Sequence, residues 1–212
     1  MTTSPDLLIL ASEVVQAVPG TRLAALAFAE VTVREQDDAL WAEIQQTVAR
    51  VAARYSDGKY SDDETLQAVR RFYYRLGVDP TKWRPASEAL VRRVTRGREL
   101  YRINNAVDII NWCSLESGLP FGLYDQAQVR GTVIFRIGRP GEGYEGIRRD
   151  DQRAEGKPVL ADELGIIGSP TADSARTMVT LATRSLLVVI YGPAEVAEAA
   201  VRRAAKPTVA HL

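Results

Sequence analysis

The 212-residue chain has one cysteine, one histidine and no net charge, with 27 basic and 27 acidic side chains. A single cysteine excludes a disulfide framework and a cysteine-rich zinc motif. The histidine is His211, at the end of the chain, so the rest of the sequence has none for a metal site, a catalytic triad or a general base. The balanced charge excludes a globally polybasic nucleic-acid binder. We expect neither a metal nor a cofactor.

Long apolar runs are also missing. No stretch reaches the roughly 18 residues that a membrane span needs, and the longest candidate, 23–33, is interrupted by Glu30. The first residues lack the basic segment of a secretory signal. We therefore expect a cytoplasmic protein without a membrane segment. The length fits a single compact domain over residues 1–212.

The hydrophobic pattern changes character along the chain. Helical spacing predicts helices over 4–18, 37–55, 62–76, 88–96 and 104–118, with one buried strand over 22–33. Beyond residue 120, short β-branched runs predict strands at 132–137, 159–161, 165–167, 178–181 and 186–191. The Gly-rich region 138–157 is a loop or mobile hairpin, and 193–206 is a last helix. The predicted fold class is mixed α/β, a mixed β-sheet packed by helices.

Basic residues gather in the segment 82–102, which carries a net charge of +5. Arg92 and Arg96 lie one helical turn apart, and Glu88 is spaced to pair with Arg92. One interpretation is a ridge that contacts phosphates, and the other is a solvated helix face with local ion pairs. The RNA-contacting candidates are Arg84, Arg92, Arg93, Arg96 and Arg102.

A polar stripe follows on the next predicted helix. Asn104, Asp108 and Asn111 are spaced four and three residues apart, so they share one helix face. Such a stripe could hydrogen-bond a polar ligand. Alternatively, Asn104 caps the helix, and Asp108 and Asn111 satisfy neighbouring backbone groups.

These two stretches carry a resemblance to a known family. The segment 102–125, RINNAVDIINWCSLESGLPFGLYD, resembles a signature of the B3/B4 domain of the phenylalanyl-tRNA synthetase beta subunit. The segment 84–93 is similar to free-standing relatives of that domain, and weaker similarity continues through 159–168 and 173–177. The core of the resemblance covers 84–190. It implies a compact α/β unit that binds and edits the mischarged end of a tRNA.

The resemblance implies a pocket like that of the synthetase, which removes tyrosine wrongly attached to the phenylalanine tRNA by hydrolysing the bond that joins them. Asn111 matches an asparagine of that pocket, but Ile110 replaces the preceding threonine. Gly122 stands where the family has a histidine, and 168–171 lacks the glutamate that reads the tyrosine hydroxyl. We therefore expect a larger, less polar pocket, and with it a different substrate amino acid, a different ligand, or no hydrolysis.

The predicted substrate-pocket residues are Asn104, Asp108, Asn111, Gly122, Gly165, Gly168, Ser169 and Thr177. For hydrolysis, Asp108 and Asp173 are the available carboxylates, and both look like scaffold groups. The expected mechanism is a positioned water, assisted by the terminal hydroxyl of the tRNA, with backbone N–H groups near Gly165 and Gly168 or the Ser169 and Thr177 hydroxyls stabilising the oxyanion.

The resulting hypothesis is a tRNA-binding protein that hydrolyses mischarged aminoacyl-tRNA in trans, an aminoacyl-tRNA deacylase rather than a complete synthetase. Its expected partners are tRNA and an aminoacyl group. Two alternatives stay open. One is an amino-acid or small-metabolite binding module without tRNA activity, and the other is an interaction domain without chemistry. The sequence leaves the oligomeric state open.

Overall fold

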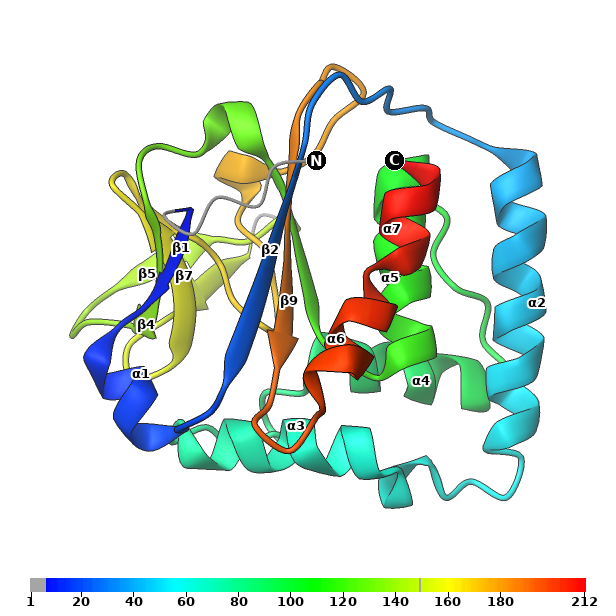
Figure 1. Cartoon of the computed structure of the whole chain (residues 1–212), viewed down its shortest axis with the longest axis horizontal. Coiled ribbons are helices and arrows are strands. Elements are labelled where there is room, and N and C mark those ends of the chain that lie inside the picture. Colours follow the sequence, from blue (N-terminus) through cyan, green and yellow to red (C-terminus); the bar gives the residue numbers. More distant parts are fainter. Residues whose placement is uncertain (1–6, 149) are drawn as a thin grey trace.

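The computed structural model describes residues 7–148 and 150–212. Its strands gather on one side of the molecule and most helices on the other (Figure 1). The strands of these ranges form a three-stranded sheet in the order β2-β9-β3, a four-stranded sheet in the order β1-β4-β7-β8, and a two-stranded hairpin of β5 and β6. The predicted mixed α/β class is confirmed, but the strands are divided among several sheets rather than joined in one.

The three-stranded sheet, here the central sheet, is built around β9 (Leu186–Gly192), whose seven residues are all buried. β9 pairs antiparallel with β2 (Arg22–Phe28) on one side and with β3 (Phe121–Asp125) on the other. Its sequence, LLVVIYG, is continuously apolar up to its glycine, as expected of a strand covered on both faces.

The four-stranded sheet packs against one face of the central sheet. Its strands are β1 (Leu8–Leu10), β4 (Val133–Ile137), β7 (Pro158–Asp162) and β8 (Gly165–Gly168). β1 runs parallel to β4 and the other pairs are antiparallel, so this sheet is mixed. Phe135 of β4 contacts Tyr191 of β9 at 5.5 Å between ring centroids, which joins the two sheets in one core.

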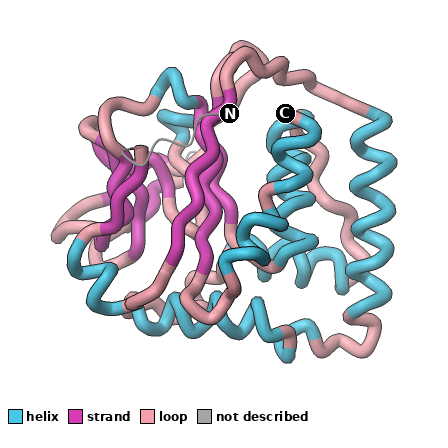
Figure 2. Tube along the Cα trace, viewed as in Figure 1, coloured by secondary structure: helices cyan, strands magenta, loops and turns pink. Residues whose placement is uncertain are grey.

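Helices cover the opposite face of the central sheet, with one helix running along the base of both layers (Figure 2). On that face lie α2 (Asp38–Arg54), α4 (Ala86–Thr95), α5 (Asn105–Ser117), α6 (Glu198–Ala204) and α7 (Lys206–His211), and α3 (Glu64–Arg75) is the helix along the base. The short α1 (Ser12–Ala17) lies on the other side, against β4 of the four-stranded sheet. The side chains of Asp37, Asp63 and Asn104 accept backbone N–H groups at the starts of α2, α3 and α5. Short 3₁₀ turns lie at Tyr60–Asp62, Gln126–Gln128 and Ala175–Thr177.

Several predicted elements need correction. Within the predicted helix 4–18, the described residues form β1 followed by the short α1, and residues 1–6 lie outside the described ranges. The predicted strand 22–33 ends at Phe28, because Glu30 adopts a φ of 58° that breaks extended backbone. The segment 178–181 is not a strand, since it leaves a 3₁₀ turn and enters another turn.

Two further differences affect the site. The predicted helix 193–206 is divided into α6 and α7, which meet at Ala205. No strand is predicted at β3, whose five buried residues follow Pro120 directly. The hairpin alternative for 138–157 is confirmed, with β5 (Gly143–Glu145) paired to β6 (Asp151–Arg153). None of the helices in the described ranges is long and apolar enough to cross a membrane.

Glu88 is the most consequential charged side chain of the core, since it is only 2% exposed on α4. Arg70 of α3 donates to both of its carboxylate oxygens at 2.7 Å, and Arg84 lies at 3.5 Å. The predicted pairing of Glu88 with Arg92 is therefore wrong, because the carboxylate points into the α3–α4 contact rather than along the helix surface. The fork of hydrogen bonds locks α4 onto α3.

We expect Glu88→Gln to lower the free energy of unfolding by about 2–3 kcal/mol, because Arg70 loses a charged acceptor inside the α3–α4 contact. Urea denaturation measures this change. Glu99→Gln is the matched control, since Glu99 is exposed and should change stability by less than about 0.5 kcal/mol. Equal losses in the two variants would contradict the structural role of the Glu88 pair.

Candidate functional site

Two glycines meet the Tyr124 side chain between the central sheet and the four-stranded sheet. Gly122 lies on β3, and Gly168 ends β8. A Cβ atom on Gly122 would stand 2.2 Å from the Tyr124 hydroxyl oxygen, and one on Gly168 would stand 2.8 Å from it. At these distances a side chain at either position would require the Tyr124 phenol to move. The phenol therefore occupies space that only glycine at these two positions leaves free.

The expectation of a larger and less polar pocket at Gly122 is wrong, because the Tyr124 phenol fills the space beside this glycine. Alternate residues of a strand point to the same face, so Tyr124 follows Gly122 on the side toward the second sheet. The hydroxyl oxygens of Tyr124 and Tyr191 lie 3.5 Å apart. Burial raises the pKa of both phenols well above the usual value, so both stay neutral and polar.

Asp173 adds a carboxylate to this cluster. It forms an isolated β-bridge with Gly168, and its Oδ2 accepts the Leu123 N–H at 3.4 Å. Its Oδ1 is buried and has no hydrogen-bond partner among the described residues, and a Cβ on Gly168 would stand 2.7 Å from it. Burial raises the pKa of Asp173 to about 7, although the Tyr124 hydroxyl and the Leu123 N–H lower it.

The absence of a carboxylate in 168–171 therefore does not leave the site without one, because the bridge returns Asp173 to the same place. We name Gly122, Tyr124, Gly168, Asp173 and Tyr191 the tyrosine–aspartate cluster. A buried carboxylate with a free acceptor beside neutral phenols suits a ligand that donates hydrogen bonds, such as an ammonium group.

The loop 169–172 closes this cluster on one side. The Ser169 hydroxyl donates to the Ala172 carbonyl at 3.1 Å and accepts the Thr171 and Ala172 N–H groups. Tyr73 exchanges a hydrogen bond with the Thr171 hydroxyl at 3.0 Å. Thr177 is fully buried and donates to the Ile167 carbonyl at 3.2 Å. The Ser169 and Thr177 hydroxyls thus bind backbone carbonyls here, and their role toward an oxyanion stays a prediction.

Gly165 lies at the opposite end of β8 from Gly168. Its φ of 127° is one that residues with side chains rarely adopt, and its carbonyl accepts a hydrogen bond from Arg176. Arg176 also binds Asp162 at 2.7 Å, which fixes the β7–β8 turn. The structure therefore places Gly165 at the start of β8, next to the β7–β8 turn, and does not bring it to the tyrosine–aspartate cluster.

The predicted polar stripe lies on α5, on the helical side of the central sheet (Figure 1). Asn104 accepts the Val107 N–H at 2.9 Å and Asp108 accepts the Ile103 N–H at 2.9 Å. Burial raises the pKa of Asp108. Asn111 is half-buried on the same helix. Asn104 and Asp108 thus shape the start of α5, and the stripe lies on the helical side of the central sheet rather than beside Tyr124.

The predicted RNA-contacting arginines divide into two groups. Arg84 forms an ion pair with Glu88 at 3.5 Å. Arg102 forms one with Asp38 at 2.5 Å, and its guanidinium lies 5.4 Å from the centroid of the Trp41 ring. These contacts use the charges of Arg84 and Arg102 within the protein. Arg92 and Arg93 are half-buried on α4, and Arg96 is exposed at its end.

Cations and aromatic rings meet along the flank of the β5–β6 hairpin. Arg93 and Arg148 lie over the Tyr101 ring at 3.8 Å and 5.7 Å from its centroid, and Lys157 lies 3.2 Å from the Trp83 centroid. We name these five residues the basic–aromatic surface. Sequence reasoning missed Arg148 and Lys157, because they join Tyr101 and Trp83 only through the tertiary fold.

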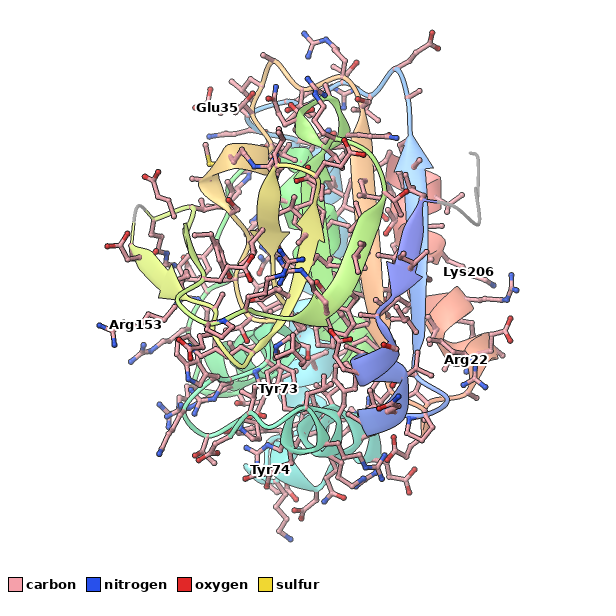
Figure 3. The ribbon with its side chains drawn as sticks, turned by 90° about the vertical axis from the view of Figure 1, so that its left-hand side faces the viewer. Arg22, Glu35, Tyr73, Tyr74, Arg153 and Lys206 are labelled. Atoms are coloured by element: carbon pink, nitrogen blue, oxygen red, sulfur yellow. The ribbon has the colours of Figure 1, made fainter. Side chains whose placement is uncertain are left out.

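The hairpin connects this surface to the tyrosine–aspartate cluster. Tyr144 of β5 donates to the Ala172 carbonyl at 2.8 Å and lies 3.2 Å from the Ser169 hydroxyl. Figure 3 shows Arg153 at the outer edge of the hairpin, with Tyr73 nearer the middle of the molecule. One short hairpin thus contacts the loop beside Asp173 and carries cations on its outer side. No cluster of three or more metal-ligating side chains occurs within 7–148 and 150–212.

We expect Asp173→Asn to change how stability depends on pH. The folded-state pKa of about 7 exceeds the ordinary 3.8, so between these values the unfolded chain binds fewer protons than the folded one. Wild-type stability should therefore fall as pH rises from 4 to 8, and the variant should gain about 2–4 kcal/mol relative to it. Urea denaturation at both pH values measures this, and parallel pH profiles would contradict it.

Comparison with known proteins follows the same segments. The B3/4 domain family model matches residues 68–210. The phenylalanine–tRNA ligase beta subunit of Cutibacterium acnes is 33% identical over 106 residues, covering 49% of this chain and 12% of that protein. The corresponding subunit of Ralstonia nicotianae is 30% identical over 151 residues, covering 67% of this chain and 18% of that protein.

Among solved structures, an N-terminal fragment of the phenylalanyl-tRNA synthetase beta subunit from Pyrococcus horikoshii matches 99% of this chain and 49% of its own, with a TM-score of 0.49 and 11% identity. The chain spans less than a fifth of the length of the curated relatives it matches. Because the family model covers residues 68–210, which include α4, α5, the β5–β6 hairpin and the tyrosine–aspartate cluster, the chain belongs to the B3/4 domain family.

Proposed function

We propose that the protein binds the aminoacylated end of a tRNA and hydrolyses the ester that joins the amino acid to it. The observation that carries the proposal is the contact of Tyr144 with the loop at Ala172. Through it, one hairpin lies against both the basic–aromatic surface and the tyrosine–aspartate cluster. A nucleic-acid strand lying along the outer side of the β5–β6 hairpin would bring its aminoacylated end to the buried carboxylate of Asp173.

The basic–aromatic surface fits the chemistry of a single-stranded RNA end. Arg148 is exposed, and with Arg93 and Lys157 it supplies positive charge for phosphates, while the Tyr101 ring is 42% exposed and offers a face on which a base stacks. Both curated relatives are named as phenylalanine–tRNA ligase subunits, which supports tRNA as the nucleic acid.

The tyrosine–aspartate cluster would receive the amino acid. Entry requires the Tyr124 hydroxyl to leave the space between Gly122 and Gly168, after which the ammonium group of the ligand reaches Asp173 Oδ1. In hydrolysis, a water oxygen bonds to the ester carbonyl carbon and the bond from that carbon to the ribose oxygen breaks. The ribose oxygen takes a proton from the water, and the terminal hydroxyl of the tRNA orients that water.

Replacing Arg93, Arg148 and Lys157 together by alanine should weaken tRNA binding and reduce its salt dependence. Each lost phosphate contact lowers the slope of log K against log salt by about 0.7–0.9, so the slope should become shallower by about 2–3. Fluorescence anisotropy at several salt concentrations measures it.

A control variant with Arg50, Arg54 and Arg71 changed to alanine removes the same charge from α2 and α3. It should leave the slope close to the wild-type value. Equal slopes in all three proteins would show that the basic–aromatic surface does not bind phosphates.

A deacylation screen across many aminoacyl-tRNAs tests the chemistry. For the substrate that is hydrolysed, Asp173→Asn should reduce the rate about 10- to 100-fold, because one charge-assisted hydrogen bond to the ligand is lost. The wild-type rate should rise with pH through about 7 as Asp173 ionises, and the variant should lose this rise. A panel that stays fully acylated at high protein concentration would refute the hydrolysis.

A binding module for free amino acids is the second candidate. Two observations favour it. Arg84 and Arg102, two of the predicted phosphate contacts, form ion pairs within the protein instead. Asp173 Oδ1 has no hydrogen-bond partner among the described residues. Such a module would show a rise in melting temperature with a free amino acid, lost in Asp173→Asn. It would show no salt-dependent affinity for tRNA.

A further inference from the structure

β2 is an edge strand without the usual protection against pairing. The order β2-β9-β3 leaves one side of β2 without a partner strand among the described residues. Residues 23–28 read LAALAF, with no charge, proline or glycine. Natural proteins block exposed edges with charged residues, proline, bulges or very short strands, and a long apolar edge otherwise pairs with another strand.

The other strands at sheet edges lack this combination. β1 and β8 have three and four residues, and a bulge interrupts the pairing of β8 with β7. β3, at the far edge of the central sheet, is buried along its whole length. β2 therefore differs from them in being seven residues long, regular in its pairing with β9, and only partly covered.

A groove of about 890 Å³ runs beside β2, between the strand and the helices α6 and α7. Its apolar lining includes Leu23 and Ala24 of β2, Val201 of α6 and Val209 of α7. The charged residues Arg22, Glu198, Arg202 and Lys206 also line it. Val209 is 48% exposed, so part of its apolar side chain in the groove is in contact with water. The apolar surface thus extends from the strand edge onto the helices.

The two ends of β2 carry opposite charges. Arg22 begins the strand, and Glu30 lies two residues beyond its end. Neither lies within ion-pair distance of an opposite charge in the described ranges, although the hydrogen bond from Arg202 and, more weakly, the charge of Arg22 lower the pKa of Glu198 in the same groove. Figure 3 shows Arg22 and Lys206 together on the side of the molecule away from Arg153. The groove is therefore separate from the basic–aromatic surface.

We propose that β2 pairs antiparallel with β2 of a second copy of this chain, forming a dimer with two-fold symmetry. Antiparallel pairing of a strand with itself is self-complementary and closes after two copies. It joins two three-stranded sheets into one, and places the Arg22 end of each strand against the Glu30 end of the other. The apolar surfaces of α6 and α7 then flank the joined sheet, adding area toward the roughly 800 Å² per partner of a stable interface.

The centre of the seven-residue strand is Ala25, so the pairing places Ala25 opposite its own copy. Cβ atoms of directly opposed residues lie about 4.5–5.5 Å apart, close enough for a disulfide after small adjustment. The native Cys113 is buried at 1% exposure and does not interfere.

Light scattering after gel filtration measures the mass of the protein in solution and so its oligomeric state. The wild-type protein should elute as a dimer, with twice the 23.3 kDa mass of one chain. Ala24→Lys, which places a charge in the groove, should give a monomer with an unchanged circular dichroism spectrum. Leu164→Lys adds the same charge at a 65% exposed position in the β7–β8 turn and should remain dimeric.

Two further experiments identify the interface. Ala25→Cys should form a covalent dimer with oxidised glutathione, whereas Leu164→Cys should not. Arg22→Glu and Glu30→Arg should each weaken the dimer about tenfold, and the double variant should recover at least half of that loss. A wild-type monomer at 100 µM, a dimer that survives Ala24→Lys, or the lack of a cross-link at Ala25 would overturn the proposal.

Discussion

The burial of β9 is the constraint on which the rest of the molecule depends. A strand of seven buried residues needs partners on both edges and cover on both faces, since its backbone groups have no access to water. β2 and β3 satisfy the edges, while the four-stranded sheet and the helices satisfy the faces. The candidate site and the proposed interface follow from this arrangement. β3 carries Gly122 and Tyr124 toward the second sheet, and β2 becomes the edge that faces the groove.

The tyrosine–aspartate cluster places two phenols and a carboxylate inside the core. Glycine at 122 and 168 creates space, and the phenol of Tyr124 takes it. The carboxylate of the cluster belongs to Asp173, which lies outside the segment 168–171 where the family resemblance implies a glutamate. Because the surrounding side chains are buried, this carboxylate has a raised pKa and an unused acceptor oxygen. Under the proposed function, a ligand reaches this carboxylate only after the Tyr124 phenol moves.

The surface separates into two regions with different chemistry. The flank of the β5–β6 hairpin combines cations with aromatic rings, and the side of β2 combines an apolar strand edge with helices α6 and α7. Because they lie on opposite sides of the molecule, a nucleic acid and a second copy of the chain would not compete for space (Figure 3). Arginines that look equivalent in the sequence differ here, since Arg84 and Arg102 form ion pairs within the protein while Arg148 is exposed.

The sequence by itself determined the mixed α/β class, the helices α2 to α5 with the caps of α2 and α5, and the family, through the segment 102–125. These depend on local periodicity, capping residues and a colinear motif, all of which are written along the chain. It did not predict β3, because Pro120 and Gly122 weaken a strand pattern that pairing with β9 rescues. Only the tertiary structure decided that Tyr124 fills the space at Gly122, that Asp173 returns to Gly168, and that Glu88 binds Arg70 rather than Arg92. Each of these contacts joins residues whose side-chain directions are set by sheet register and helix packing, which no local pattern specifies.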